Sequence, residues 1–295
     1  MAWKPLDREP DLPALPDGVT LVDSHCHLDL DFDADRSEVL ARARAAGIGA
    51  MVTIGASGAF AANRAAVALA AAHDAIQATV GVHPHEAASV TDAVLDTVAE
   101  LATRPKVVAI GETGLDYDRA FSPRADQLAN LRRHLELAWE LCRPLILHCR
   151  SRSGERDAQD ALLAELAAAG VGDTTWAARL GGRPPAVLHS FSGPVDYAER
   201  ALAMGCVISF SGLVFRRGEE ASALVARLVP EALLLTETDS PYLSPPGAPR
   251  RRNEPRWVEV TARWLAEQRR ADPEALGEAV VVAYDRLIGR SPRPG

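Results

Sequence analysis

The sequence predicts an α/β fold, a single (β/α)₈ barrel of the TIM type. Eight short apolar segments alternate with longer segments of helical periodicity, which is the pattern of strands joined by helices. The chain has 295 residues, and a barrel takes about 250 residues as one unit. A doubly wound sheet is the alternative, because it shows the same alternation and differs only in strand order.

Each expected strand is short and apolar, as parallel strands buried on both faces are. In chain order we expect strands at Leu21–Asp23, Met51–Ile54, Ile76–Val82, Val107–Ile110, Leu145–Leu147, Ala186–Leu188, Cys206–Phe210 and Leu233–Thr236.

The clearest helix is expected from Pro123 to Cys142, where Ser122 is placed to cap the helix and Pro123 to begin it. Its period of 3.6 residues aligns one apolar stripe, made of Leu128, Leu131, Leu135 and Trp139.

Two segments fall outside the repeat. Residues 1–18 are acidic and rich in proline, and we expect them to form an extension that precedes a barrel domain of residues 19–295. Residues 151–184 are longer than one helix requires. Within them Gly170–Pro185 is rich in Gly, Thr, Arg and Pro, and we expect a long loop near the mouth of the barrel.

The composition excludes some classes of protein. With a net charge of −8, the chain is not a generally basic nucleic-acid-binding protein, so a polyanionic substrate would require a local positive patch or a metal. The four cysteines show no disulfide-like pattern, which indicates reduced thiols in a cytoplasmic protein. There is no apolar signal core near the N-terminus and no run of 18 apolar residues, so we expect no membrane partner.

Five of the expected strands end in a side chain that can bind a metal. In a barrel all carboxyl ends of the strands converge on one face, where catalytic groups gather. These candidates are His25 and His27 after the first strand, Glu112 after the fourth, His148 after the fifth, His189 after the sixth and Asp239 after the eighth.

Their chemistry suits divalent ions. His25 and His27 are two residues apart, so on an extended strand both side chains point to the same face. Imidazole and carboxylate together bind zinc or manganese, and carboxylates also bind magnesium. Six ligands exceed what one tetrahedral ion requires, which favours two ions with Glu112 as the bridging carboxylate.

The alternative for each residue taken singly is structural. A lone histidine at a strand end is more often packed or hydrogen-bonded than a ligand, and Glu112 or Asp239 could form a salt bridge or cap a loop. The joint placement of all six on one face favours the metal site.

The chain also resembles a known family, the TatD deoxyribonucleases, which are metal-dependent hydrolases of the amidohydrolase superfamily. The resemblance runs in order over residues 21–255. Its motifs are Asp23–Asp29 (DSHCHLD), Gly81–His85 (GVHPH), Ile110–Tyr117 (IGETGLDY), Leu147–Arg150 (LHCR), Leu188–Gly193 (LHSFSG), Ser209–Leu213 (SFSGL), Thr236–Leu243 (TETDSPYL) and Arg252–Pro255 (RNEP).

This resemblance implies a TIM-type barrel and 3′–5′ exonuclease activity on DNA. It places one ion among His25, His27, Glu112 and Asp239, and a second ion among Glu112, His148 and His189. Two positions depart from the family pattern: Ser151–Glu155 follow the LHCR motif where the family has an acidic residue and Ala, and Tyr284–Leu287 lacks the usual Asn.

The residues support the same chemistry. A bound divalent ion acidifies water, and Asp239 could accept the proton as general base, while a second ion neutralises charge on the substrate. The catalytic residues that we predict are therefore Asp239 and Glu112.

Further residues are candidates for contact with the substrate. Arg250, Arg251 and Arg252 precede Asn253, a candidate cap for a helix that starts near Glu254, and would form an anion site there, although a solvated cluster is the alternative. His83 and His85 could donate to a phosphate or fix a carboxylate behind a metal ligand.

Cys26 is expected to point away from His25 and His27 into packing, and His73 and His134 to lie on helices, in solvent or core.

We therefore predict a metallohydrolase that uses two divalent ions (Mg, Mn or Zn) and cleaves phosphodiester bonds, with DNA ends or short oligonucleotides as substrate. The nearest alternative is hydrolysis of a small amide, ester or lactone, or of a D-aminoacyl-tRNA ester as the resemblance also allows. A metal-binding interaction protein without turnover is the alternative from another class.

Overall fold

The structure is a computed structural model that describes residues 20–29, 32, 35–56, 60–249 and 252–290. The expected extension at residues 1–18 lies outside this described part, as do Arg250 and Arg251. Within it, eight parallel strands form one sheet in the order β1 to β8. The strands are β1 Leu21–Cys26, β2 Ile48–Ile54, β3 Ile76–Val80, β4 Val107–Asp116, β5 Leu145–Arg150, β6 Ala186–Leu188, β7 Val207–Phe210 and β8 Leu234–Thr236.

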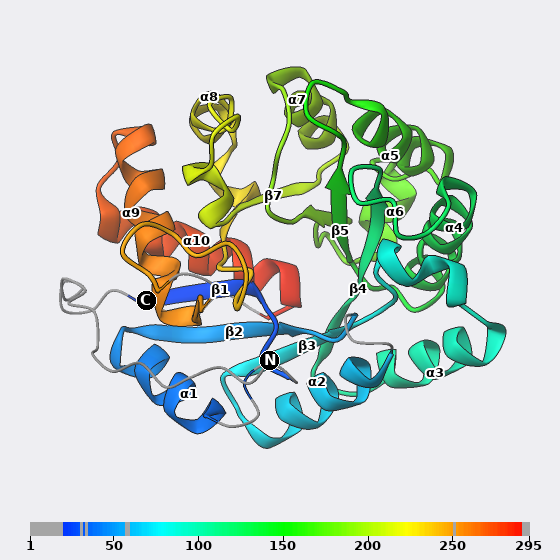
Figure 1. Ribbon diagram of the computed structural model, residues 1–295, viewed down its shortest axis with the longest axis horizontal. Helices are drawn as coiled ribbons and strands as arrows, with labels where there is room; N and C mark the ends of the chain where they lie inside the picture. Colours follow the sequence, from blue (N-terminus) through cyan, green and yellow to red (C-terminus); the bar gives the residue numbers. More distant parts are fainter. Residues whose placement is uncertain (1–19, 30–31, 33–34, 57–59, 250–251, 291–295) are drawn as a thin grey trace.

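Helices surround the strands as a ring (Figure 1). They are α1 Arg36–Ala45, α2 Ala61–Ala72, α3 Asp92–Ala102, α4 Arg124–Glu140, α5 Asp157–Ala168, α6 Thr174–Arg179, α7 Val195–Ala203, α8 Ser222–Leu228, α9 Val258–Arg269 and α10 Pro273–Ile288. Short 3₁₀ helices include η2 Pro84–Ser89, η3 Gly212–Phe215, η4 Glu231–Leu233 and η5 Pro255–Trp257.

The sheet is a nearly closed barrel. Since each strand pairs with the next in the chain, no strand order is reversed, and the doubly wound alternative is excluded. The first and last strands meet beyond β8 at a parallel bridge between Cys26 and Ser240, where the His27 amide donates to the Ser240 carbonyl at 2.7 Å. The predicted TIM-type fold is confirmed.

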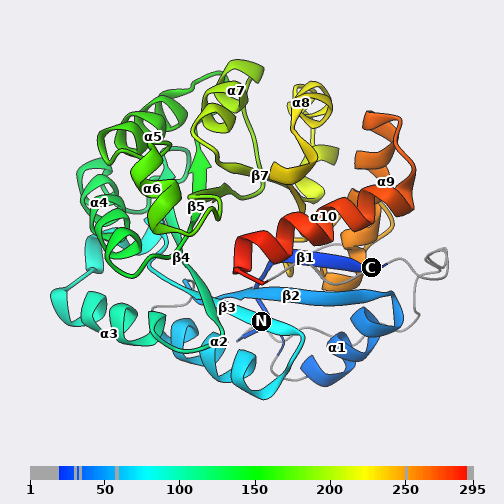
Figure 2. The ribbon, with the colours of Figure 1, turned by 180° about the vertical axis from the view of Figure 1, so that it is seen from behind.

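Two apolar cores hold the barrel together. One lies between the strands and the surrounding helices. The other lies inside the barrel and consists mostly of small and β-branched side chains from the strands, among them Val52, Ile146 and Val207. Helix α10 adds Val280 and Tyr284 to this interior core, and Figure 2 shows α10 lying across the strands. The interior is therefore packed at one end, and polar groups are confined to the other.

The segment at Gly170–Pro185 is not a loop near the mouth, so this expectation was wrong. It contains helix α6 and leads into the start of β6, and a helix-to-strand connection lies on the face opposite the carboxyl ends of the strands. Arg183 fixes it there by donating to the carbonyl of Cys142, which precedes β5.

The predicted helix at Pro123–Cys142 exists as α4, but Ser122 does not cap it. The Ser122 hydroxyl instead donates to the His85 carbonyl at 2.8 Å and accepts from the Ala88 amide at 3.0 Å. It therefore ties η2 to the start of α4. Likewise, Asn253 does not begin an α-helix, because η5 intervenes before α9.

Candidate metal centre

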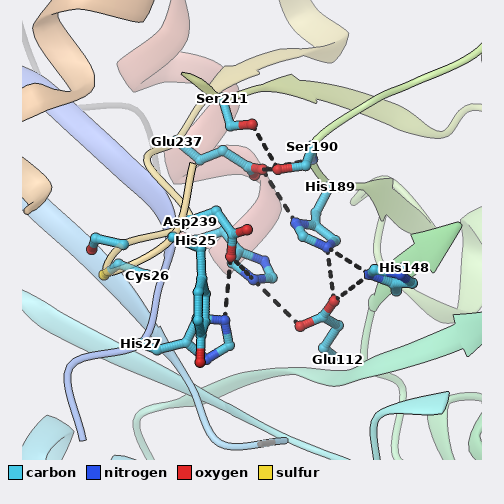
Figure 3. Close-up of polar contacts among 12 residues, drawn as sticks. His25, Cys26, His27, Glu112, His148, His189, Ser190, Ser211, Glu237 and Asp239 are labelled. Carbon is cyan, nitrogen blue, oxygen red and sulfur yellow. Dashed lines mark hydrogen bonds and ion pairs between the residues drawn. The ribbon is translucent and has the colours of Figure 1, made fainter. Parts of the chain in front are cut away.

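Six side chains converge at the carboxyl end of the barrel (Figure 3). They come from five strands or the turns that follow them, and all of the predicted ligands are among them. His25 lies on β1 and His27 directly follows it, Glu112 lies on β4, His148 lies on β5, His189 follows β6, and Asp239 follows β8.

A first group consists of His25, His27 and Asp239, whose ligand atoms lie within 4.8 Å of one another. The Oδ1 atom of Asp239 is 3.3 Å from His27 Nε2 and 3.5 Å from His25 Nε2. Asp239 has φ of 54°, a left-handed conformation that Asp adopts more readily than most residues. This turn directs its carboxylate back towards β1.

A second group consists of His83, His148 and His189, which surround the Oε1 atom of Glu112. The Oε1 atom is 2.7 Å from His189 Nε2, 3.0 Å from His148 Nδ1 and 3.4 Å from His83 Nε2. The Oε2 atom of the same carboxylate is 3.5 Å from His25 Nε2. Glu112 therefore stands between the two groups, with one oxygen towards each.

The burial of His25 provides a test of whether these residues fit a cation. His25 is fully buried, and neither of its ring nitrogens makes a hydrogen bond within the described part of the chain. Burial, together with the neighbouring His189, lowers the pKa of His25, so the ring is neutral and has a lone pair available. An unsatisfied buried nitrogen costs about 1–3 kcal/mol. A cation at Nε2, between Glu112 and Asp239, would remove this cost.

The carboxylates give the site the charge that a cation requires. Burial alone would raise the pKa of Glu112, but His189, His83 and His148 hold it well below its ordinary value. Burial alone would lower the pKa of His189, but Glu112 and Glu237 hold it well above its ordinary value. Negative charge is thus concentrated on buried oxygens, and the donor set suits divalent metal ions.

The two remaining histidines of the mouth differ in their surroundings. His83 is near Glu112, and burial lowers its pKa to about 4, so it is neutral near pH 7. His85 Nε2 is 2.7 Å from Asp116 Oδ2, and the same oxygen is 3.3 Å from His148 Nε2. His83 therefore lies next to the ligand groups, whereas His85 contacts Asp116, the carboxylate on the far side of the His148 ring from Glu112.

Arg252 does not lie beside the ligands on an open surface. Its guanidinium is buried, pairs with Asp35 just before α1, and lies 3.4 Å from Glu254 Oε1. This arrangement ties the segment after β8 to α1, and we leave Arg252 out of the substrate contacts that we propose below.

Cys26 points away from the two histidines, as expected, and its thiol donates to the Val52 carbonyl at 3.3 Å. All four cysteines are free thiols. His134 lies in the core, fully buried on α4.

Sequence reasoning missed two carboxylates of the site, Asp116 and Glu237. Glu237 Oε1 is 3.2 Å from His189 Nδ1 and accepts from the Ser190 amide at 2.6 Å and the Ser190 hydroxyl at 2.8 Å. A signal was present, since Asp116 is four residues from Glu112 and Glu237 is two residues from Asp239, spacings that share a face on an extended chain.

Comparisons with known proteins place most of the chain in one family. The sequence profile of the TatD-related DNases matches residues 22–289. The 3′–5′ ssDNA/RNA exonuclease TatD of Cronobacter sakazakii is 39% identical over 265 residues, which cover 88% of this chain and 94% of the relative. Its counterpart in Dickeya dadantii is 38% identical over 285 residues, covering 94% and 97%. The crystal structure of YjjV, a TatD homologue from Escherichia coli, has a TM-score of 0.77 at 28% identity and covers 92% of this chain and 98% of its own.

Among the residues that the structure describes, none of the helices combines the length and the apolar character that crossing a membrane requires.

Proposed function

Because the chain belongs to the family of TatD-related DNases, we propose that it is a divalent-metal-dependent phosphodiesterase that removes nucleotides from the 3′ end of single-stranded DNA or RNA. The curated relatives are named for this activity and align over most of both chains. The observation that carries the proposal is the position of Glu112, whose two oxygens face two separate groups of ligands.

Two ions are part of this proposal. His25, His27 and Asp239 would hold one, His148 and His189 would hold the other, and Glu112 would contribute to both. When bound, such ions bring water closer to ionisation at neutral pH and stabilise the charge that develops on phosphate oxygens. Magnesium, manganese and zinc all suit this mixture of imidazole and carboxylate.

The chain's own residues supply the remaining chemistry. Asp239 is partly exposed at the mouth, and the histidines beside it hold its pKa below the ordinary value against the effect of burial, so it is ionised and can accept a proton from the attacking water. Neutral His83 can donate a hydrogen bond to a phosphate oxygen beside Glu112. Hydrolysis would then release a nucleoside 5′-monophosphate and leave a new 3′ hydroxyl.

The proposed activity can be tested with 5′-labelled single-stranded DNA and Mg²⁺, Mn²⁺ or Zn²⁺ added in turn. We expect products that shorten one nucleotide at a time, and a phosphorothioate linkage at the 3′ end should block them. Asp239→Asn should lower kcat at least about 100-fold, the low end for loss of a general base.

Metal content must be measured in the same samples, since loss of an ion would also abolish turnover. His25→Ala combined with His27→Ala should lose bound metal, whereas His73→Ala, a histidine at the end of α2, should keep it. Absence of nuclease activity together with hydrolysis of a small ester or lactone would contradict the proposed substrate. Near-normal kcat of Asp239→Asn at full metal content would exclude Asp239 as the base.

A further inference from the structure

The two histidines beside Glu112 Oε1 present different ring nitrogens to it. His148 faces this oxygen with Nδ1 at 3.0 Å, and His189 faces it with Nε2 at 2.7 Å. The opposite nitrogen of each ring is next to a carboxylate: His148 Nε2 is 3.3 Å from Asp116 Oδ2, and His189 Nδ1 is 3.2 Å from Glu237 Oε1. Both rings are thus held between Glu112 and a second carboxylate, in opposite orientations.

A neutral imidazole carries one hydrogen, and an ionised carboxylate can only accept. Glu112 faces the opposite nitrogens and competes for the same hydrogens, so the outer carboxylates set the tautomer when a cation occupies the Glu112 side of the rings. With a cation there, Asp116 favours the hydrogen on Nε2 of His148, and Glu237 favours it on Nδ1 of His189. The two nitrogens left with lone pairs, Nδ1 of His148 and Nε2 of His189, are 3.3 Å apart on the side of Glu112. They point to a common position.

Both outer carboxylates are themselves fixed. Asp116 Oδ1 accepts from the amides of Asp118 at 3.0 Å and Arg119 at 2.8 Å, and Oδ2 is 2.7 Å from His85 Nε2. Glu237 is fully buried and accepts from both the amide and the hydroxyl of Ser190, whose hydroxyl is in turn 2.7 Å from that of Ser211 (Figure 3). Side chains held in this way can orient a ring.

We infer that Asp116 and Glu237 are positioning residues that hold His148 and His189 in opposite tautomers, so that Nδ1 of one and Nε2 of the other bind the same ion. This inference deepens the proposed function and rests on it, because it takes the second ion to lie between these two rings. It also assigns His85 to the support of Asp116 rather than to direct contact with substrate. Carboxylates behind ligating histidines typically change metal affinity 10- to 100-fold.

The first measurement needs no variant. Long-range ¹H–¹⁵N NMR spectra of the protein loaded with Zn²⁺, which is diamagnetic, report which nitrogen of each ring carries the hydrogen. We expect Nε2–H for His148 and Nδ1–H for His189. The same tautomer on both rings would overturn the inference.

The second measurement is calorimetric titration with Mn²⁺. Asp116→Asn and Glu237→Gln should each lower the affinity for one of the two ions by about 10- to 100-fold and leave the affinity for the other ion near its wild-type value. Asp116→Glu should recover part of the loss. Matched controls are Asp118→Asn, two residues along the chain and paired with Arg150, and Glu219→Gln, which also accepts from a serine hydroxyl, that of Ser192. Both controls should bind two ions as the wild type does.

The outcomes separate the two proposals. Wild-type protein that binds fewer than two ions and degrades no DNA would contradict the proposed function. Wild-type protein that binds two ions, with Asp116→Asn and Glu237→Gln binding both equally well, would contradict only the positioning role.

Discussion

His134 shows how burial fixes the protonation state of a single residue. Its ring is fully buried on α4, where Nε2 accepts from the Val82 amide at 3.0 Å and Nδ1 is 2.8 Å from the Asn130 carbonyl. Both bonds are satisfied by the neutral ring with its hydrogen on Nδ1. Since Val82 directly precedes His83, this core histidine fixes the chain where it enters the mouth.

This environment predicts a loss of stability in mild acid. Burial lowers the pKa of His134 from 6.5 to about 4. Between these values the unfolded chain takes up a proton that the folded protein excludes, so stability is complete above pH 6.5 and falls as the pH drops towards 4. The resulting loss in the free energy of unfolding is about 3 kcal/mol at most.

Urea unfolding of metal-free protein at several pH values measures this effect. His134→Gln should be less stable than the wild type at pH 7 but should lose less stability between pH 6.5 and 4. Parallel curves for the two proteins would show that His134 does not cause the acid sensitivity.

At the level of residues, the sequence was sufficient to find the groups that face the proposed ions. All six predicted ligands are brought together, because strand ends in a parallel barrel meet on one face. It was not sufficient to find Asp116 and Glu237, whose role depends on which nitrogen of a ring they contact. It also could not separate Arg252 from its neighbours, since the pairing with Asp35 joins residues 217 positions apart.

Strand β4 is the strand whose predicted bounds differ most from the structure. The sequence predicts a strand at Val107–Ile110, because this run is short and apolar, but β4 continues to Asp116. Gly111 and Gly114 allow close approach to β5: a Cβ on Gly114 would overlap the carbonyl oxygen of His148. The two glycines thus let one strand carry both Glu112 and Asp116.

This close approach predicts a specific cost for a methyl group on β4. Gly114 has φ of 138°, and Gly154, in the loop after β5, has φ of 82° with no atom near its would-be Cβ. Gly154→Ala should therefore lower the free energy of unfolding only because alanine disfavours this left-handed backbone conformation, by about 1–2 kcal/mol. In Gly114→Ala the new methyl group also overlaps the β5 backbone, which should lower the free energy of unfolding by roughly 1–3 kcal/mol more.

Thermal unfolding of the two metal-free variants gives the comparison, and Mn²⁺ titration of Gly114→Ala should also show weaker binding, because His148 is displaced. Equal stability of the two alanine variants would contradict the tight β4–β5 packing.

The whole molecule combines a negative net charge with a proposed polyanionic substrate. The net charge is −8, and the mouth itself contains the carboxylates of Glu112, Asp116, Glu237 and Asp239. Attraction for a nucleic acid must then come from bound divalent ions and from local cations. The sequence predicted this requirement from composition alone, and the barrel adds that the buried carboxylates lie at the end not filled by α10.

Arg250 and Arg251 are the cations that we propose for this role, on the basis of the sequence next to Asn253. Each contact with a phosphate of a single strand contributes roughly 0.7 to the slope of log affinity against log salt. Replacing both with Gln should therefore flatten the slope by up to about 1.4, whatever the base sequence. Fluorescence anisotropy with labelled oligonucleotides, measured in the Asp239→Asn background to prevent turnover, gives this slope.

Arg252→Gln is the matched comparison, because this arginine is buried and paired with Asp35. Removing one partner of a buried pair should lower the free energy of unfolding by about 3–5 kcal/mol. Its salt slope should remain that of the parent protein under conditions where it is folded. Metal content should be unchanged in the Arg250→Gln, Arg251→Gln double variant, since neither residue is a proposed ligand. If that double variant binds oligonucleotides with the parent slope, these arginines do not contact the substrate, and the bound ions must supply the attraction by themselves.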